Sequence, residues 1–320
     1  ARAPGAGGRG GGPPDARGGD GMSSRPLAAP AASPARLRAG DFVTLAKVRV
    51  NTLVLVTTAL GYLLARRAVE GWTLFHAILG TGLVAAGAAA FNQIWERELD
   101  ARMRRTAQRP LASGRMEVLP ASLFAFALSA AGLVELSLGA NLLAAAIAAA
   151  TLLLYVLVYT PMKRVTSLAT IVGAVPGALP PVIGWAAAGG GLGAGAWVLF
   201  AILFFWQMPH FLAIAWLYRA DYARAGFPML PVLEPDGAST GRQAALYAAT
   251  LVPVSLALST LRVTGPVYSA GAVLCGLAFT GAAAIFAFRR TTAAARWLFA
   301  ASILYLPVLL LLAFLDGGRP

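Results

Sequence analysis

The sequence NQIWERELDARMRRTAQRP occupies residues 92–110 and closes a long apolar segment. Asn92, Glu96 and Asp100 are spaced four residues apart, so on a helix their side-chain oxygens lie along one face. The stretch continues with a cluster of cations: Arg102, Arg104, Arg105 and Arg109. Hard oxygen ligands beside guanidinium groups suit a Mg²⁺ ion that bridges to a phosphate group. The stretch therefore predicts diphosphate chemistry at the surface of a membrane.

The composition of the chain predicts an integral membrane protein. Hydrophobic residues make up 58% of the 320 residues and charged residues only 12%, and the mean hydropathy is +0.70. The apolar runs are continuous rather than alternating, which favours helices over a β-barrel. The net charge of +13 is explained by basic loops that orient membrane helices, so we expect no nucleic-acid partner. A single cysteine, Cys275, excludes an internal disulfide.

Nine apolar spans have lengths near the ~20 residues that cross a bilayer. They lie at about residues 43–65, 71–95, 118–138, 141–160, 167–188, 195–217, 242–262, 266–288 and 295–315. The fifth span contains Pro176, Pro180 and Pro181, so we expect it to be kinked or broken. Residues 43–316 are thus predicted to form an all-α, polytopic membrane helix bundle.

Residues 1–42 are rich in Gly, Pro, Ala and Arg and contain few large apolar side chains. Such a segment buries too little surface to fold, and we predict a disordered tail. Its arginines resemble those of a transit peptide, but Asp15, Asp20 and the glycine runs oppose that interpretation. Met22 is an alternative start of the chain.

The distribution of Lys and Arg predicts the orientation of the spans. With the N-terminus inside, the inner segments hold twenty of these residues and the outer segments hold four. The positive-inside rule then places the N-terminus in the cytoplasm and the C-terminus outside. The acids after the second span and Asp221 after the sixth span share the inner side, four spans apart. A four-helix internal repeat would let both acidic ends face one cavity.

Lys47 and Arg49 lie within the first predicted span, close to its inner boundary. Two interpretations remain open for them. Either their side chains reach the interface by snorkelling, or they contact phosphate oxygens from another wall of the cavity.

Two more polar stretches interrupt the apolar spans. The first, YTPMKRVT at residues 159–166, contains Lys163 and Arg164, which either orient the helix or contribute to a site. The second, FFWQMPHF at residues 204–211, places His210 inside a span. This imidazole is either satisfied by a neighbouring helix or belongs to a pocket whose aromatic rings bind a flat ring and shield a carbocation.

Four motifs together carry a family resemblance. They are Asn92-x3-Glu96-x3-Asp100-x2-Met103-x-Arg105-Thr106-x2-Arg109-Pro110, Tyr159-Thr160-x2-Lys163-Arg164-x-Thr166, Trp206-Gln207-x-Pro209-His210-Phe211 and Asp221-Tyr222-x3-Gly226-x-Pro228-Met229. Over roughly residues 43–315 the chain resembles the protoheme IX farnesyltransferases (heme O synthases) of the UbiA intramembrane prenyltransferase superfamily. It departs from the superfamily pattern in having Glu96 where many members have Asp, and in having Asp221 as the single acid of its second motif.

The resemblance implies a nine-helix UbiA-type bundle that joins the farnesyl group of farnesyl diphosphate to a vinyl group of heme B. Addition of water then gives heme O and diphosphate. Under this hypothesis the Mg²⁺ ligands are Asn92, Glu96, Asp100 and Asp221. The diphosphate contacts are Lys47, Arg49, Arg105, Arg109, Lys163 and Arg164. The heme contacts are Trp206, Gln207 and His210, with ligation of the iron as one role for His210.

The resemblance also implies a setting and leaves alternatives. The expected setting is a bacterial inner membrane, or the mitochondrial inner membrane as the alternative, with a heme A synthase or terminal oxidase assembly downstream. A quinone or other aromatic-acceptor prenyltransferase is the closest alternative enzyme. A transporter that uses Pro-broken helices is the alternative from another class, but it leaves the cluster of acids and arginines unexplained.

Overall fold

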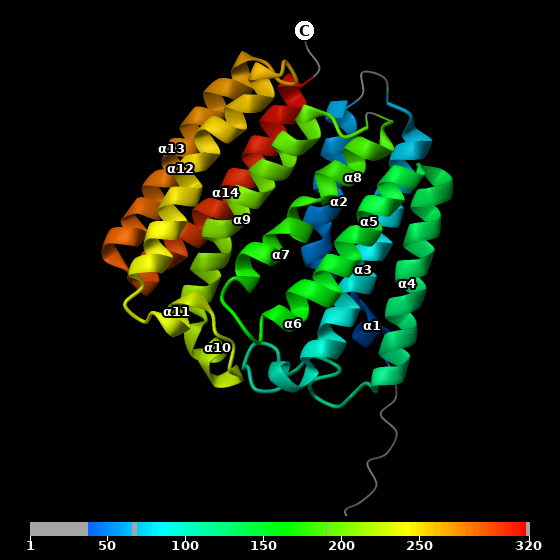
Figure 1. Cartoon of the computed structure of the whole chain (residues 1–320), viewed down its shortest axis with the longest axis vertical. Coiled ribbons are helices and arrows are strands. Elements are labelled where there is room, and N and C mark those ends of the chain that lie inside the picture. The colour runs from blue at the N-terminus through cyan, green and yellow to red at the C-terminus, as the bar shows by residue number, and fades with distance from the viewer. Residues whose placement is uncertain (1–37, 66–68, 190, 318–320) are drawn as a thin grey trace, which may run out of the picture. The chain divides into compact units, whose positions relative to one another are not determined.

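The computed structural model describes residues 38–65, 69–189 and 191–317, and helices dominate these residues (Figure 1). Nine helical segments of the described residues are long and apolar enough to cross a membrane, which confirms the predicted helix bundle. They are α2 (Val48–Ala65), α3 (Gly71–Asp100), α4 (Val118–Gly139), α5 to α6 (Leu142–Met162), α7 and α8 (Ala169–Ala187), α9 (Ala194–Leu217), α12 (Ala238–Thr260), α13 (Pro266–Arg289) and α14 (Thr292–Asp316). The predicted tail at 1–42 lies almost entirely outside the described residues, and its last four residues belong to α1 (Ala39–Ala46).

Two hydrophobic cores organise the bundle. One packs α9, α12, α13 and α14 together, and the other packs α3, α4 and α5. Both cores include residues of α2 and α8, such as Leu60 and Trp185 in the first and Tyr62 and Ile183 in the second. The pair α2 and α8 therefore lies between the two groups of helices, which Figure 1 shows on either side.

The pair α2 and α8 packs with its backbones in close approach. A Cβ atom added to Gly184 would overlap the carbonyl oxygen of Thr58, and one added to Gly61 would overlap that of Pro181. Small residues allow this approach, as is common between membrane helices.

The first predicted span, 43–65, is not one helix. The chain leaves α1 at Lys47, whose φ of 48° and ψ of 46° are left-handed, and begins again with α2. The break is held locally, because the side-chain amide of Asn51 donates to the carbonyl of Ala46 over 2.7 Å. The apolar character of the span does not reveal this break. Because the backbone of Lys47 is left-handed, its side chain does not follow the helical repeat of its neighbours.

Two spans contain the irregularities of the central region. The fourth consists of α5 (Leu142–Leu153), a π-helical turn η1 (Leu154–Tyr159) and α6 (Thr160–Met162), and the π-helix was not predicted. The fifth breaks at Leu179 between α7 (Ala169–Ala178) and α8 (Pro180–Ala187), as its prolines predicted.

The inner-side segments of the predicted topology gather at one end of the bundle. Helix α1, the loop at 101–117, α10 (Arg219–Ala225) and α11 (Leu230–Leu233) all lie at the lower end of Figure 1, whereas α14 ends at the upper end. Met103 of the loop is buried against Ala225 and Phe227 in a small separate core. The two acidic segments, four spans apart in sequence, are therefore neighbours.

Candidate active site

A cavity of about 440 Å³ lies among α2, α3, α5, η1, α7, α8 and α9. Most of its lining is apolar, with side chains such as Leu53, Val84 and Ile183. Its charged residues are Lys47 and Arg109, at the end of the bundle that contains the acids of α3. An apolar chamber with cations at one end suits a long hydrocarbon attached to an anionic head.

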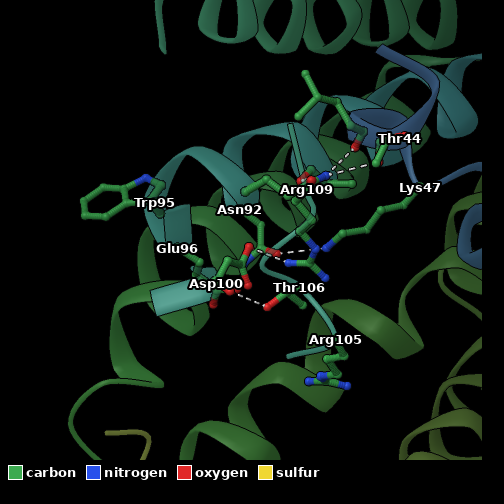
Figure 2. A network of polar contacts seen from close by, with 12 residues as sticks. Thr44, Lys47, Asn92, Trp95, Glu96, Asp100, Arg105, Thr106 and Arg109 are labelled. Atoms are coloured by element: carbon green, nitrogen blue, oxygen red, sulfur yellow. Dashed lines mark hydrogen bonds and ion pairs between the residues drawn. The ribbon is translucent and has the colours of Figure 1, made fainter. Parts of the chain in front are cut away.

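Three polar residues of α3, spaced four apart, form one buried face, as their spacing predicted. Asn92, Glu96 and Asp100 are 2%, 4% and 1% exposed. Figure 2 shows them pointing toward Lys47 and Arg109, whereas Trp95 points away from them. Helical periodicity alone accounts for this face, because residues four apart recur on the same side of a helix.

Each member of this face accepts a hydrogen bond from a different cation. Lys47 Nζ lies 3.0 Å from Asn92 Oδ1, and Lys163 Nζ lies 2.7 Å from Glu96 Oε1. Arg109 Nη1 lies 2.6 Å from Asp100 Oδ2. Three of the six predicted diphosphate contacts thus converge on the α3 face from three separate parts of the chain.

The two lysines have opposite electrostatic settings. Burial, together with the positive charges of Arg109 and Lys163, lowers the pKa of Lys47 to about 7. Burial also disfavours the charged form of Lys163, but Tyr159 and Glu96 outweigh this effect and hold its pKa above the ordinary range. The difference arises because Lys163 contacts a carboxylate and Lys47 a neutral amide, so an anion bound in the cavity would favour the charged form of Lys47.

The residues of the α3 face fit a divalent cation. Asp100 Oδ1 is buried and has no hydrogen-bond partner among the described residues. An orphaned carboxylate oxygen is costly to bury unless a ligand completes it. The described residues contain no group of three His, Cys, Asp or Glu side chains that could hold a metal. The oxygen ligands that the α3 face could offer are therefore the carboxylates of Glu96 and Asp100 and the amide of Asn92. Water or phosphate oxygens would complete the coordination of Mg²⁺.

Among the described residues, the side chain of Asp221 makes no hydrogen bond or ion pair with this face and does not line the cavity. Its carboxylate pairs with Arg224 on the same short helix, α10. The connection between the two segments is instead Arg105, whose Nη2 donates to the hydroxyl of Tyr222 over 2.6 Å. The Arg105 guanidinium also lies 4.9 Å from the ring centroid of Tyr218.

Two other predicted contacts lie away from the cavity. Arg49 is exposed and makes no hydrogen bond or ion pair among the described residues. Arg164 is exposed as well, and its guanidinium donates to the backbone carbonyl of Trp95. Neither side chain lines the cavity.

The three predicted heme contacts do line the cavity, on the side of α9. The rings of Trp206 and His210 are stacked, with centroids 5.1 Å apart and planes inclined by 23°. The side-chain amide of Gln207 donates to Leu203 O over 3.0 Å, so it is held by its own helix. These side chains form a wall that faces the apolar interior.

Sequence reasoning gave no role to several residues that complete the site. Tyr155 and Tyr159, both on the π-helical turn, line the cavity, and Lys163 Nζ lies 4.4 Å from the ring centroid of Tyr159. Thr160 Oγ1 accepts from Asn92 Nδ2 over 3.3 Å, and Thr106 Oγ1 donates to Asp100 O over 2.8 Å. The sequence shows these residues as a polar run at the end of an apolar span. It does not show which of them face the cavity.

Comparison with known families and curated proteins gives consistent matches. The model of the UbiA prenyltransferase family matches residues 54–304. The chain is 50% identical over 286 residues to the protoheme IX farnesyltransferase of Solibacter usitatus (strain Ellin6076), covering 86% of this chain and 98% of that relative. It is 44% identical over 308 residues to the protoheme IX farnesyltransferase of Koribacter versatilis (strain Ellin345), covering 92% and 99% of the two chains.

Solved structures share the fold at low identity. The chain is similar to a digeranylgeranylglyceryl phosphate synthase, with a TM-score of 0.74 and 19% identity over 87% of this chain and 97% of the other. It is also similar to a UbiA homolog from Archaeoglobus fulgidus bound to GPP and Mg²⁺, with a TM-score of 0.63 and 14% identity over 85% and 99% of the two chains.

Proposed function

We propose that this chain, which belongs to the UbiA prenyltransferase family and within it to the protoheme IX farnesyltransferases, transfers a farnesyl group from farnesyl diphosphate to heme B. The products are heme O and diphosphate. The observation that carries the proposal is the α3 face of Asn92, Glu96 and Asp100, buried beside three cations at one end of an otherwise apolar cavity.

The cations of this face are proposed to bind the diphosphate. Lys47, Arg109 and Lys163 donate to oxygens of α3, and the oxygens of a diphosphate can accept charge-assisted hydrogen bonds from the same N–H groups. A transfer of these donors to diphosphate leaves the α3 oxygens free for a metal. Mg²⁺ bound there would supply charge stabilisation to the departing diphosphate.

We assign secondary roles to the remaining charged residues of the predicted set. Arg49 and Arg164 are exposed and lie outside the cavity lining, so we propose that they attract the anionic substrate. Arg105 holds α10 and the loop at 101–117 together through Tyr222. The carboxylate of Asp221 would be available to hold a metal only if its pair with Arg224 were open.

The chemical step breaks the allylic C–O bond and the π bond of the heme vinyl group, and it forms one C–C bond and one C–O bond. The allylic C–O bond of farnesyl diphosphate breaks, and the terminal carbon of the heme vinyl group forms a C–C bond with the farnesyl carbon. Water adds its oxygen to the adjacent vinyl carbon and releases a proton, which leaves a hydroxyethyl carbon. The ring faces of Tyr155 and Tyr159 line the cavity and are suited to stabilise the allylic cation.

The apolar interior is proposed to hold both hydrocarbon parts. The farnesyl chain lies along Leu53, Val54 and Val84, and the porphyrin approaches the wall of Trp206, Gln207 and His210. Stacked aromatic rings offer a flat apolar surface of the kind that a porphyrin plane covers well.

We further propose the bacterial inner membrane as the location, with the N-terminus in the cytoplasm. The basic loops lie at the end of the bundle that contains the acids of α3, and the positive-inside rule places that end on the cytoplasmic side. Heme O is a membrane-soluble product, so a heme A synthase or a terminal oxidase assembly is the expected recipient.

The test is a direct assay with an alternative acceptor. Purified full-length protein receives heme B, farnesyl diphosphate and Mg²⁺, and the heme is analysed by mass spectrometry. We expect a mass gain of one farnesyl group plus one water, with release of diphosphate. A parallel reaction with a phenolic quinone precursor should give no product. Prenylation of the phenol but not of heme would favour an aromatic-acceptor enzyme instead.

A further inference from the structure

Ser302 of α14 contacts the ring of His210, which belongs to α9. His210 Nδ1 and Ser302 Oγ are 2.7 Å apart, although 92 residues separate them in the sequence. Ser302 is fully buried. Its hydroxyl also donates to the carbonyl of Phe299 over 2.6 Å, and its own carbonyl accepts from Trp206 Nε1 over 2.8 Å.

The hydrogen count selects one tautomer of His210. A serine hydroxyl has one hydrogen, and here it is donated to Phe299 O. His210 Nδ1 must then be the donor in its contact with Ser302, so Nε2 carries the lone pair. The reverse arrangement would lose the bond to Phe299 and leave an N–H at Nε2. The first arrangement makes two hydrogen bonds in an apolar setting and is therefore favoured.

Aromatic rings fix the plane of the same imidazole. Trp206 stacks on it at 5.1 Å, and Phe299 lies 5.1 Å away with its plane inclined by 30°. His210 lines the cavity, and Nε2 makes no hydrogen bond within the described residues. The Nε2 atom of this neutral imidazole thus offers a lone pair in a fixed orientation.

We propose that Ser302 is a positioning residue that holds His210 with the Nε2 lone pair directed to the iron of heme B in the cavity. The inference rests on the proposed function, which supplies heme as the substrate. Neutral imidazole is a common iron ligand, and the hydrogen bond made by its other nitrogen sets the ring orientation. Ligation at this point would fix the porphyrin, and with it the reacting vinyl group, relative to α9.

The test is a titration of ferric heme B into the purified full-length protein without farnesyl diphosphate, followed by absorbance and EPR. Wild type should show the signature of a nitrogen ligand, and His210→Ala should lose it. Ser302→Ala should weaken heme binding about three- to tenfold, because one hydrogen bond to the ligand is lost. Ser302→Thr keeps a hydroxyl and should restore most of the affinity. Ser129→Ala is the matched control, because Ser129 is also buried, bonds to its own helix and does not line the cavity.

A double-variant cycle separates positioning from packing. In a His210→Ala background, Ser302→Ala should have no further effect on heme affinity. An equal loss of heme affinity in both backgrounds would overturn the role of Ser302. A spectrum without a nitrogen-ligand signature for heme bound to the wild-type protein would overturn it as well. Thermal unfolding of each variant checks that it is folded, and Ser302→Thr keeps the test valid if Ser302→Ala unfolds.

The mass assay of heme O distinguishes this inference from the proposed function. Heme O formation without a nitrogen-ligand signature would contradict the inference alone. The expected ligation pattern without heme O formation would contradict the farnesyl transfer alone.

Discussion

Lys163 Nζ lies 2.7 Å from Glu96 Oε1, and both side chains are mostly buried, at 16% and 6% exposure. The pair joins the end of α6 to α3 across 67 residues of sequence. Removal of one partner from a buried ion pair leaves an uncompensated charge, whereas an exposed pair contributes little.

The first prediction therefore concerns this pair. Lys163→Met should lower the free energy of unfolding by about 3–5 kcal/mol, and the double variant Lys163→Met/Glu96→Gln should recover much of that loss. Both should lose heme O formation, because the diphosphate contact is gone. Thermal unfolding in detergent and the mass assay measure the two effects. Glu98→Gln is the control, since its pair with Arg97 is exposed. Equal destabilisation by Glu98→Gln would contradict the assignment.

The second prediction concerns the orphaned oxygen of Asp100. Asp100→Asn keeps the shape of the side chain and removes the charge, so turnover should fall about 100-fold or more and the Mg²⁺ concentration for half-maximal rate should rise. Wild type treated with a chelator should lose activity and regain it with Mg²⁺.

Substitution of a second, half-buried acid supplies the control for Asp100. Glu135→Gln alters an acid that pairs with His76 and does not line the cavity. It should leave the Mg²⁺ dependence unchanged. An Asp100→Asn enzyme with wild-type turnover and Mg²⁺ dependence would rule out the metal assignment.

The third prediction concerns the left-handed backbone of Lys47. Lys47→Gly relieves the backbone conformation and Lys47→Ala does not, so the glycine variant should be more stable by about 1 kcal/mol. Both remove the amino group beside Asn92 and should raise KM for farnesyl diphosphate about tenfold. Denaturant unfolding and steady-state kinetics measure the two quantities. An unchanged KM would exclude Lys47 from diphosphate binding.

The fourth prediction concerns the close approach of α2 and α8. Gly184→Ala forces a methyl group against the backbone of Thr58 and should lower stability by about 1–3 kcal/mol. Gly281→Ala is the matched control, because a Cβ at Gly281 of α13 meets nothing within 4 Å. Its unfolding midpoint should stay the same or rise slightly, since Ala favours a helix. Similar midpoints for both variants would show that the α2 and α8 backbones can separate at little cost.

The sequence by itself determined the membrane class, the nine spans and the face of Asn92, Glu96 and Asp100. Each of these depends on local quantities, namely the transfer energy of about twenty consecutive residues and the period of one helix. The break at Leu179 was equally local, because proline lacks an N–H wherever it stands.

Only the tertiary structure decided which cations meet that face and which imidazole nitrogen is free. Lys163, Arg109 and Lys47 were equal candidates with Arg49 and Arg164 in the sequence, and of these five only the first three bond to the side chains of Glu96, Asp100 and Asn92. The left-handed turn at Lys47 and the contact of His210 with Ser302 were likewise invisible. Such contacts depend on how close two helices pack and on which faces they turn to each other, and periodicity within a single helix carries no information about its partner.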